Sequence, residues 1–320
     1  MNFWDNYWWV ILLIFLLILV LLFLLRWYQF HHIDYKWEKK RHFPQWTNSG
    51  VITRDNYLLR TNYNFVEDSR CVVIGVHSMG GSKEDFNLAK DFFHKQKISF
   101  LSFDQRNWGE NGKWKYHSLG TTVSDIEDII NVVIERFPKQ KIILLGDSFG
   151  SSLVALALKR LDNQVAGAIL TNFVTKNWNF KLTASLFFKL AAGLIFYKNI
   201  LLPITYDPSD LSDRTEYVDA VNERNYRRNN KSFTLLYLMQ AKNSTKSVVK
   251  NINDTVSPVL VIQSGEDILA DYDKVEDNEK KWRKGVTYKF YKKGKHAILN
   301  DSHTDAVLKD IEKWISGIKG

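Results

Sequence analysis

The chain has 320 residues and a formal net charge of +9 at pH 7. This charge suggests an anionic partner, but the absence of zinc-ligand spacings, nucleic-acid motifs and basic repeats argues against nucleic acid. An anionic membrane surface explains the charge more simply, and an ordinary solvated surface is the alternative. The single cysteine, Cys71, excludes an intrachain disulfide and implies no oxidising compartment.

The N-terminal segment reads as a transmembrane helix. Residues 8–25 carry no charged or strongly polar side chain, and at about 1.5 Å per residue they span about 27 Å. A cleaved signal peptide would need a basic leading region and a small-residue cleavage site, which this segment lacks. We therefore expect residues 1–28 to form an uncleaved anchor. Aromatic residues typical of membrane interfaces gather at both ends of the span: Trp4, Tyr7, Trp8 and Trp9 at its start, and Trp27 and Tyr28 after its end.

Residues 29–49 read as a basic aromatic linker. No Lys or Arg precedes the span, whereas several follow it closely. The positive-inside rule then predicts a single-pass protein of the cell membrane whose main domain faces the cytoplasm, with a domain on the outer face as the alternative. The basic residues that decide this are Arg26, Lys36, Lys39, Lys40 and Arg41.

Strand and helix patterns alternate after residue 50. Residues 50–54 and 57–63 read as an antiparallel hairpin, and residues 123–137 have apolar side chains at helical spacing. This alternation predicts one α/β domain over residues 50–320 with a mostly parallel sheet. The apolar segments that read as its strands are residues 72–76, 98–104, 142–146, 166–171, 258–264 and 287–291.

A candidate nucleophile lies in segment 142–150, where an apolar strand runs into the pattern G-x-S-x-G and a helical pattern follows. A strand, a sharp turn and a helix in this order form a nucleophile elbow. The turn requires small residues at Gly146 and Gly150, so that Ser148 can hold a strained backbone and expose its hydroxyl. Ser148 is therefore the candidate nucleophile.

Residues 172–257 interrupt the alternation with helical patterns and lie where a lid would cover the site. Residues 182–202 are rich in Leu, Phe and Ala, which favours an acyl chain beneath the lid; packing of the lid on the domain is the alternative. Lys189 argues against a second membrane span there. The second half is polar, and we expect its charged residues at the surface: Glu216, Asp219, Glu223, Arg224, Arg227 and Arg228.

A serine hydroxyl needs a histidine base and a carboxylate that orients the histidine. After this kind of elbow the acid comes first and the histidine second, and the histidines beyond Ser148 are His296 and His303. His296 follows the last predicted strand, whereas His303 opens the final helix and reads as a surface residue. Asp267 is the favoured acid because it directly follows a strand, and Asp271 in the same loop is the alternative. All these candidates lie beyond strand ends, where ligands bind in open α/β sheets.

Two backbone N–H groups are candidates for an oxyanion hole. The N–H of Phe149 follows the nucleophile at the start of a helix, where N–H groups lack intrahelical partners. The second donor should come from the glycine-containing loop 77–82, and we assign it to Met79.

These residues resemble those of α/β-hydrolases, in the serine hydrolase group of monoglyceride lipases, lysophospholipases and related bacterial membrane-anchored hydrolases. The resemblance runs from about residue 50 to the C-terminus. The segments that carry it are residues 77–81, 104–109 (similar to D-x-R-G-x-G), 146–150, 265–267 and 296–301 (similar to H-x-[IL]-x-N-[DE]).

The chain also departs from the pattern of this group. Ser78 stands where Gly is usual, and Asn107 and Trp108 replace a Gly-His pair. Asp267 comes two residues after Gly265, one residue sooner than in the commoner G-x-x-D spacing, which keeps Asp271 open.

The resemblance and the candidate triad predict a membrane-anchored serine hydrolase that acts on a lipid ester, a monoacylglycerol or a lysophospholipid, through an acyl-serine intermediate. This chemistry requires no metal and no organic cofactor. One alternative is a serine peptidase acting at the amino end, with Glu216 or Asp219 binding the α-amine. Others are a thioesterase with the same machinery and a non-catalytic membrane binding module.

Overall fold

The computed structural model describes residues 3–35, 42–111, 117–174, 184–195, 197–203, 207–228, 232–269, 277 and 280–318. Seven strands form the main sheet: β4 (Thr61–Asn64), β5 (Cys71–Val76), β6 (Ser99–Phe103), β7 (Lys141–Asp147), β8 (Gly167–Thr171), β11 (Val259–Ser264) and β12 (Val286–Tyr291). They lie in the order β12-β11-β8-β7-β5-β6-β4. Neighbours are parallel, except that β4 runs antiparallel to β6.

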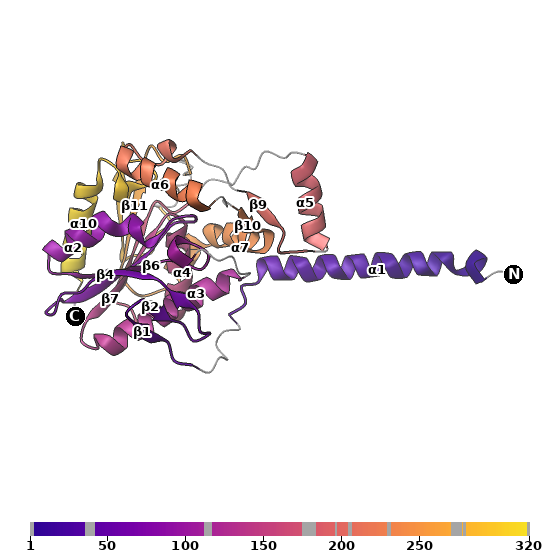
Figure 1. Ribbon diagram of the computed structural model, residues 1–320, viewed down its shortest axis with the longest axis horizontal. Coiled ribbons are helices and arrows are strands. Elements are labelled where there is room, and N and C mark those ends of the chain that lie inside the picture. Colours follow the sequence, from indigo (N-terminus) through magenta and orange to yellow (C-terminus); the bar gives the residue numbers. More distant parts are fainter. Residues whose placement is uncertain are drawn as a thin grey trace.

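Helices cover both faces of the sheet because its strands are apolar on both sides. In β5, Val72 and Ile74 belong to one core cluster with α3 (Leu119–Arg136), α4 (Phe149–Leu161), α7 (Leu235–Lys246) and α8 (Val248–Asn253). Val73 belongs to the other cluster, with α2 (Asn87–Lys95) and α10 (Thr304–Gly317). The result is a three-layer α/β/α domain, which confirms the predicted fold class (Figure 1).

The N-terminal hairpin is present, but residues 57–63, predicted as its second strand, contain two strands, β3 (Leu58–Leu59) and β4, and β4 joins the main sheet beside β6. β2 (Gly50–Ile52) pairs antiparallel with β3 (Leu58–Leu59). β1 (Gln45–Thr47), which lies in the predicted linker, pairs with β2 on its other side. The linker expectation thus missed a short strand that ends three residues before residue 50.

The insertion contains α5 (Ala184–Ile195), β9 (Leu201–Pro203), η4 (Pro208–Asp210), α6 (Thr215–Arg228) and β10 (Ser232–Thr234). β9 and β10 pair antiparallel, a small sheet that the helical patterns did not predict. α7 and α8 also fall within predicted insertion 172–257, yet their apolar residues join the main core beside α4. We therefore call the segment from residue 172 to the end of β10 the lid. In the loops that the structure describes outside the lid, short 3₁₀ helices are η2 (Lys83–Phe86), η3 (Gly109–Asn111) and η5 (Ile298–Asn300).

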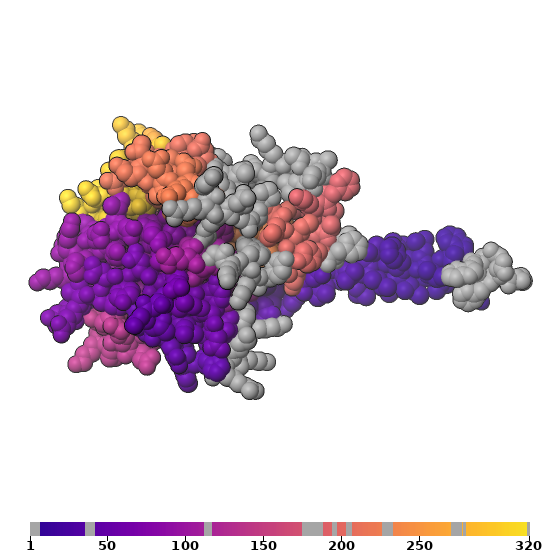
Figure 2. All heavy atoms as spheres, in the orientation of Figure 1, coloured from indigo at the N-terminus to yellow at the C-terminus, as the bar shows by residue number. Residues whose placement is uncertain are grey.

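Helix α1 (Phe3–His31) projects from the domain with its N-terminal end far from the sheet (Figures 1 and 2). Its portion Tyr7–His31 is long and apolar enough to cross a membrane, and the apolar stretch is not buried. The helix continues three residues past the predicted anchor boundary at residue 28, and Phe30 is buried in the main core. The basic residues 36 and 39–41 lie outside the described residues.

The last turn of α1 is fixed to α7 by side-chain amides. Gln240 donates from Nε2 to the carbonyl oxygens of Gln29 (3.0 Å) and His32 (3.1 Å). Asn243 donates from Nδ2 to the carbonyl oxygen of Phe30 at 3.1 Å. Helix ends leave carbonyl groups without intrahelical partners, and these amides satisfy them. Lid helix α5 also packs against α1: one end of α5 lies against α1 close to the point where α1 leaves the domain, and the rest of α5 points away from α1 (Figure 1).

Candidate active site

Ser148 lies at the sharp turn between β7 and α4. Its backbone has φ 54° and ψ −115°, a strained conformation for a residue with a side chain. Its N–H donates to the carbonyl oxygen of Thr171 at 2.8 Å, which ties the turn to β8. A Cβ at Gly150 would overlap the carbonyl oxygen of Val76, and one at Gly146 would come within 2.6 Å of the α4 backbone. The turn therefore requires glycine at both positions.

The hydroxyl of Ser148 lies against the His296 ring, with 2.7 Å between Oγ and Nε2. On the other side of the ring, Nδ1 lies 2.8 Å from Oδ1 of Asp267. An ionised carboxylate can only accept, so Nδ1 carries the ring proton and Nε2 is left to accept from the serine hydroxyl. Asp267 Oδ1 also accepts the backbone N–H of Leu269 at 2.7 Å, which holds the carboxylate in place. The structure thus brings together three buried residues from three separate loops.

The alternative candidates lie elsewhere. Asp271 lies outside the described residues. His303 precedes α10 and is partly exposed, with its Nδ1 3.7 Å from Asp301. The contact with His296 is made by Asp267.

A second carboxylate, Asp147, is buried directly before the nucleophile. Burial raises the pKa of Asp147 to about 6, although the charge of His296 and a hydrogen bond of 2.8 Å from the Thr171 hydroxyl oppose this. Burial by itself lowers the pKa of His296, but Asp267 and then Asp147 favour the imidazolium, so that its pKa ends above the usual value. The pKa of His296 therefore depends on two carboxylates, Asp267 and Asp147.

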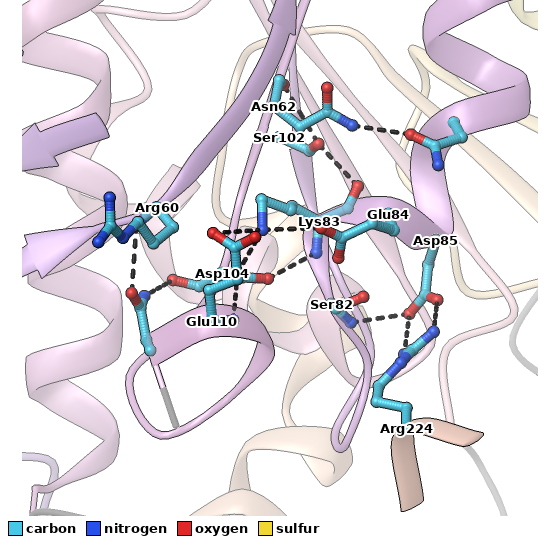
Figure 3. A network of polar contacts seen from close by, with 12 residues as sticks. Arg60, Asn62, Ser82, Lys83, Glu84, Asp85, Ser102, Asp104, Glu110 and Arg224 are labelled. Atoms are coloured by element: carbon cyan, nitrogen blue, oxygen red, sulfur yellow. Dashed lines mark hydrogen bonds and ion pairs between the residues drawn. The ribbon is translucent and has the colours of Figure 1, made fainter. Parts of the chain in front are cut away.

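The loop of residues 78–82 is held at both ends by the turn that follows β6. At its start, Nε2 of buried His77 accepts the backbone N–H of Gln105 at 2.9 Å, so Nδ1 donates to the carbonyl oxygen of Ser78 at 2.7 Å. Burial lowers the pKa of His77, which keeps this ring neutral. At its end, the Asp104 carboxylate accepts the backbone N–H of Lys83 and pairs with its ammonium, each at 2.8 Å (Figure 3).

The two predicted oxyanion donors lie on this loop and on α4. Met79 is half-buried within the loop and packs against the main core. Phe149 is the first residue of α4, so its N–H has no acceptor within the helix. Their role as donors stays a prediction.

The departures from the family pattern have local explanations. Asn107 has φ 69°, a left-handed conformation that asparagine tolerates better than most residues with a side chain. The ring of Trp108 lies 4.8 Å from that of Phe233 in the lid strand β10. The carbonyl oxygen of Ser78 accepts the N–H of Gly81 at 3.0 Å, which closes the loop into a turn.

Several residues around the site were not predicted from the sequence. Asn172, at the end of β8, binds the loop that carries His296. Arg224 was expected at the surface, but its side chain is only 15% exposed and pairs with Asp85, which directly follows the loop of residues 78–82. This expectation was wrong: the carboxylate that pairs with Arg224 is 139 residues away in the chain, so the local sequence gave no sign of it. Glu216, Asp219 and Glu223 are exposed, as expected, and the side chains of residues 227 and 228 are not described.

The comparisons with known proteins agree with this fold. A structure of monoacylglycerol lipase from Paleococcus ferrophilus superposes with a TM-score of 0.68 at 18% identity, covering 82% of this chain and all of that one. A soluble variant of monoglyceride lipase from Saccharomyces cerevisiae, bound to a substrate analogue, gives 0.69 at 13% identity, covering 87% and 95%. Est1E from Butyrivibrio proteoclasticus with bound ferulic acid gives 0.59 at 16% identity, covering 83% and 98%. At these identities the likeness concerns the fold.

No curated protein matches the sequence. The family model described as serine aminopeptidase, S33, matches residues 67–303, which include the elbow, Asp267, His296 and the whole lid. The chain therefore belongs to this family of α/β-hydrolases, and the membership supports a hydrolase.

Proposed function

We propose that this protein is a membrane-anchored serine hydrolase that cleaves carboxylic esters of lipids, a monoacylglycerol or a lysophospholipid, through an acyl-serine intermediate. The observation that carries the proposal is the hydrogen-bonded chain from Ser148 through His296 to Asp267 on a strained elbow. A serine hydroxyl placed in this way can lose its proton to a neutral imidazole as it attacks a carbonyl carbon.

The reaction follows from these contacts. Nε2 of His296 takes the proton as Ser148 Oγ bonds to the ester carbon, and Asp267 stabilises the resulting imidazolium. The backbone N–H groups of Met79 and Phe149 donate hydrogen bonds to the negative oxygen of the tetrahedral intermediate. The intermediate expels the alcohol, which takes the proton from His296 and leaves the acyl-serine. Water, activated by the same imidazole, then releases the fatty acid and restores the serine.

A buried cluster of aromatic side chains, which reaches the residue after the nucleophile, is the observation in favour of an apolar substrate. The Trp108, Phe233 and Tyr237 rings lie in contact, with ring centres 4.8 Å apart in the first pair and 5.9 Å in the second. Tyr237 also meets the ring of Phe149, which directly follows the nucleophile. Aromatic and apolar walls with few polar groups are typical of sites for apolar ligands. The structural neighbours named as monoacylglycerol lipases agree with this choice.

The arrangement of α1 and α5 supports a substrate that comes from the membrane. If α1 crosses the bilayer, its docking on α7 holds the domain close to the membrane surface. One end of α5 lies against α1 on the side from which α1 leaves the domain, and the rest of α5 turns away from α1 (Figure 1), so α5 would lie close to that surface. Phe188 on α5 is 70% exposed, as expected of a side chain that meets lipid. On this proposal the lid faces the leaflet that presents the ester.

The test is labelling of the full-length, detergent-solubilised protein with a fluorophosphonate, comparing wild type with Ser148→Ala, Asp267→Ala and Asp271→Ala. We expect labelling to disappear in Ser148→Ala, to fall strongly in Asp267→Ala and to persist in Asp271→Ala. Wild-type protein that keeps its fold and does not label would refute the hydrolase and favour the non-catalytic binding module.

The substrate class is tested by turnover of a monoacylglycerol, a lysophospholipid, an acyl thioester and an aminoacyl anilide under the same conditions. Lipid ester turnover that is lost in Ser148→Ala supports the proposal. Faster turnover of the anilide would favour the peptidase alternative. Glu216 and Asp219, the carboxylates suggested for an α-amine, are both exposed on α6, which does not favour that alternative.

A further inference from the structure

A largely buried ion pair joins the lid to η2, the short helix that directly follows the oxyanion loop (residues 78–82). Arg224 on α6 binds the carboxylate of Asp85 in η2 with two hydrogen bonds, 2.6 Å from Nη2 and 3.1 Å from Nη1 (Figure 3). The Asp85 side chain is 5% exposed and that of Arg224 is 15% exposed. Two-point pairs of arginine with a carboxylate fix orientation as well as distance.

The same carboxylate also contacts the C-terminal end of the oxyanion loop. Oδ2 of Asp85 accepts the backbone N–H of Ser82 at 2.9 Å. It also lies so close to Gly81 that a Cβ on that residue would come within 2.5 Å of Oδ2. The position of the carboxylate therefore determines the path of the chain three residues beyond Met79.

The backbone of Asp85 reaches the histidine loop as well. Its carbonyl oxygen accepts a hydrogen bond of 2.8 Å from Nδ2 of Asn300, four residues after His296. The lid contacts this loop directly, because the N–H of Ala297 donates to the carbonyl oxygen of Leu211 at 2.8 Å. One short element thus meets the lid, the oxyanion loop and the loop of the catalytic base.

We propose that the Arg224–Asp85 pair is a positioning latch that makes the oxyanion hole depend on the seating of lid helix α6. With α6 seated, the guanidinium balances the buried carboxylate, which holds the Ser82 N–H and keeps the Met79 N–H directed at the oxyanion. With α6 displaced, Asp85 is a buried charge without its cation, an unfavourable state that the loop relieves by moving. The enzyme is then fully active only with the lid seated. This inference rests on the proposed function.

The pair is a latch rather than a structural contact if its loss lowers kcat. The oxyanion forms only in the transition state, so a displaced donor loop reduces kcat and leaves substrate binding almost unchanged. If the contact only stabilises the lid, its loss should instead lower Tm, or raise KM because the substrate site is disturbed.

The experiment measures kcat and KM for p-nitrophenyl butyrate, with Tm, on the full-length solubilised protein. The variants are Arg224→Gln, Arg224→Lys, Asp85→Asn and the double variant Asp85→Asn/Arg224→Gln. We expect Arg224→Gln to lower kcat about tenfold, part of the effect of losing one oxyanion donor, with KM within about twofold. Arg224→Lys should recover part of the loss. The double variant should be no worse than the poorer single variant, because both changes break one coupling.

Arg70→Gln is the matched control, because it removes an exposed ion pair with Glu312. It should leave kcat unchanged. An Arg224→Gln variant with wild-type kcat, or single effects that multiply in the double variant, would overturn the latch. Ser148→Ala separates the two proposals: if wild-type turnover does not require Ser148, the proposed function fails, and if it does, the Arg224 result alone decides the latch.

Discussion

The side-chain amide of Asn172 donates a hydrogen bond of 2.6 Å to the backbone carbonyl oxygen of His296. The same amide nitrogen binds the carbonyl oxygen of Lys295 at 2.9 Å and Oγ of Ser264 at 2.8 Å. Its oxygen accepts the N–H of Ser264 at 2.8 Å, at the end of β11. One side chain at the end of β8 therefore joins the histidine loop to the neighbouring strand.

Replacing Asn172 by Gly should lower kcat about tenfold with the fold retained, since a shift of about 1 Å in a catalytic group is costly. Glycine accepts the φ of 44° at this position, so the variant removes the amide without adding backbone strain. Asn56→Gly is the control, because Asn56 also has a positive φ, 62°, in an exposed turn. Equal kcat in wild type and Asn172→Gly, at matched circular dichroism, would refute this role.

The pH profile should show the influence of Asp147 on His296. The base must be neutral to accept a proton, so kcat/KM falls as pH drops through the pKa of His296, which lies above its usual value. The Asp147 carboxylate, with a pKa of about 6, is charged above that pH and favours the imidazolium. Asp147→Asn removes this charge, lowers the pKa of His296 and should move the acidic limb to lower pH. An unchanged or oppositely shifted limb in a full profile would contradict the coupling.

Gly150→Ala should abolish fluorophosphonate labelling and reduce the yield of folded protein. The added methyl group would overlap the carbonyl oxygen of Val76, and both partners are backbone atoms of core elements that cannot easily move. Gly317→Ala is the control, because a Cβ there has no heavy atom within 4 Å. Labelling and thermal unfolding of the two variants, made side by side, test this difference. Normal labelling of Gly150→Ala would mean that the elbow is less tight than the structure indicates.

Gln240→Ala should loosen the attachment of α1 to the domain. The variant loses bonds to the carbonyl oxygens of Gln29 and His32 and to the backbone N–H of Leu119. At about 1 kcal/mol per bond, the expected loss of stability is about 2 to 3 kcal/mol. Asn243→Ala removes the hydrogen bond to the carbonyl oxygen of Phe30 in α1 and should have a smaller effect. Thermal unfolding and limited proteolysis after residue 31 measure the difference; equal sensitivity of both variants and wild type would argue against fixed docking.

Local pattern determined much of the fold. Hydrophobic periodicity and glycine spacing, which act over a few residues, account for six of the seven strands of the main sheet, the helix before the nucleophile strand, the elbow at Ser148 and the long apolar N-terminal helix. The order of serine, acid and histidine along the chain also allowed Ser148, Asp267 and His296 to be selected as candidates. The fold class and family that these patterns predicted are confirmed, whereas the catalytic roles stay predictions.

Tertiary structure decided which distant side chains meet. Nothing near Arg224 or Asp85 in the sequence indicates that they pair across 139 residues, and nothing near Asn172 indicates that it binds the histidine loop. The same holds for α7. It belongs to the core rather than to the lid because its apolar residues pack against α4. Sequence patterns show local propensity and which face of an element is buried. Contacts between residues far apart in the chain depend instead on the order of the strands in the sheet and on the need of each buried charge for a counter-charge.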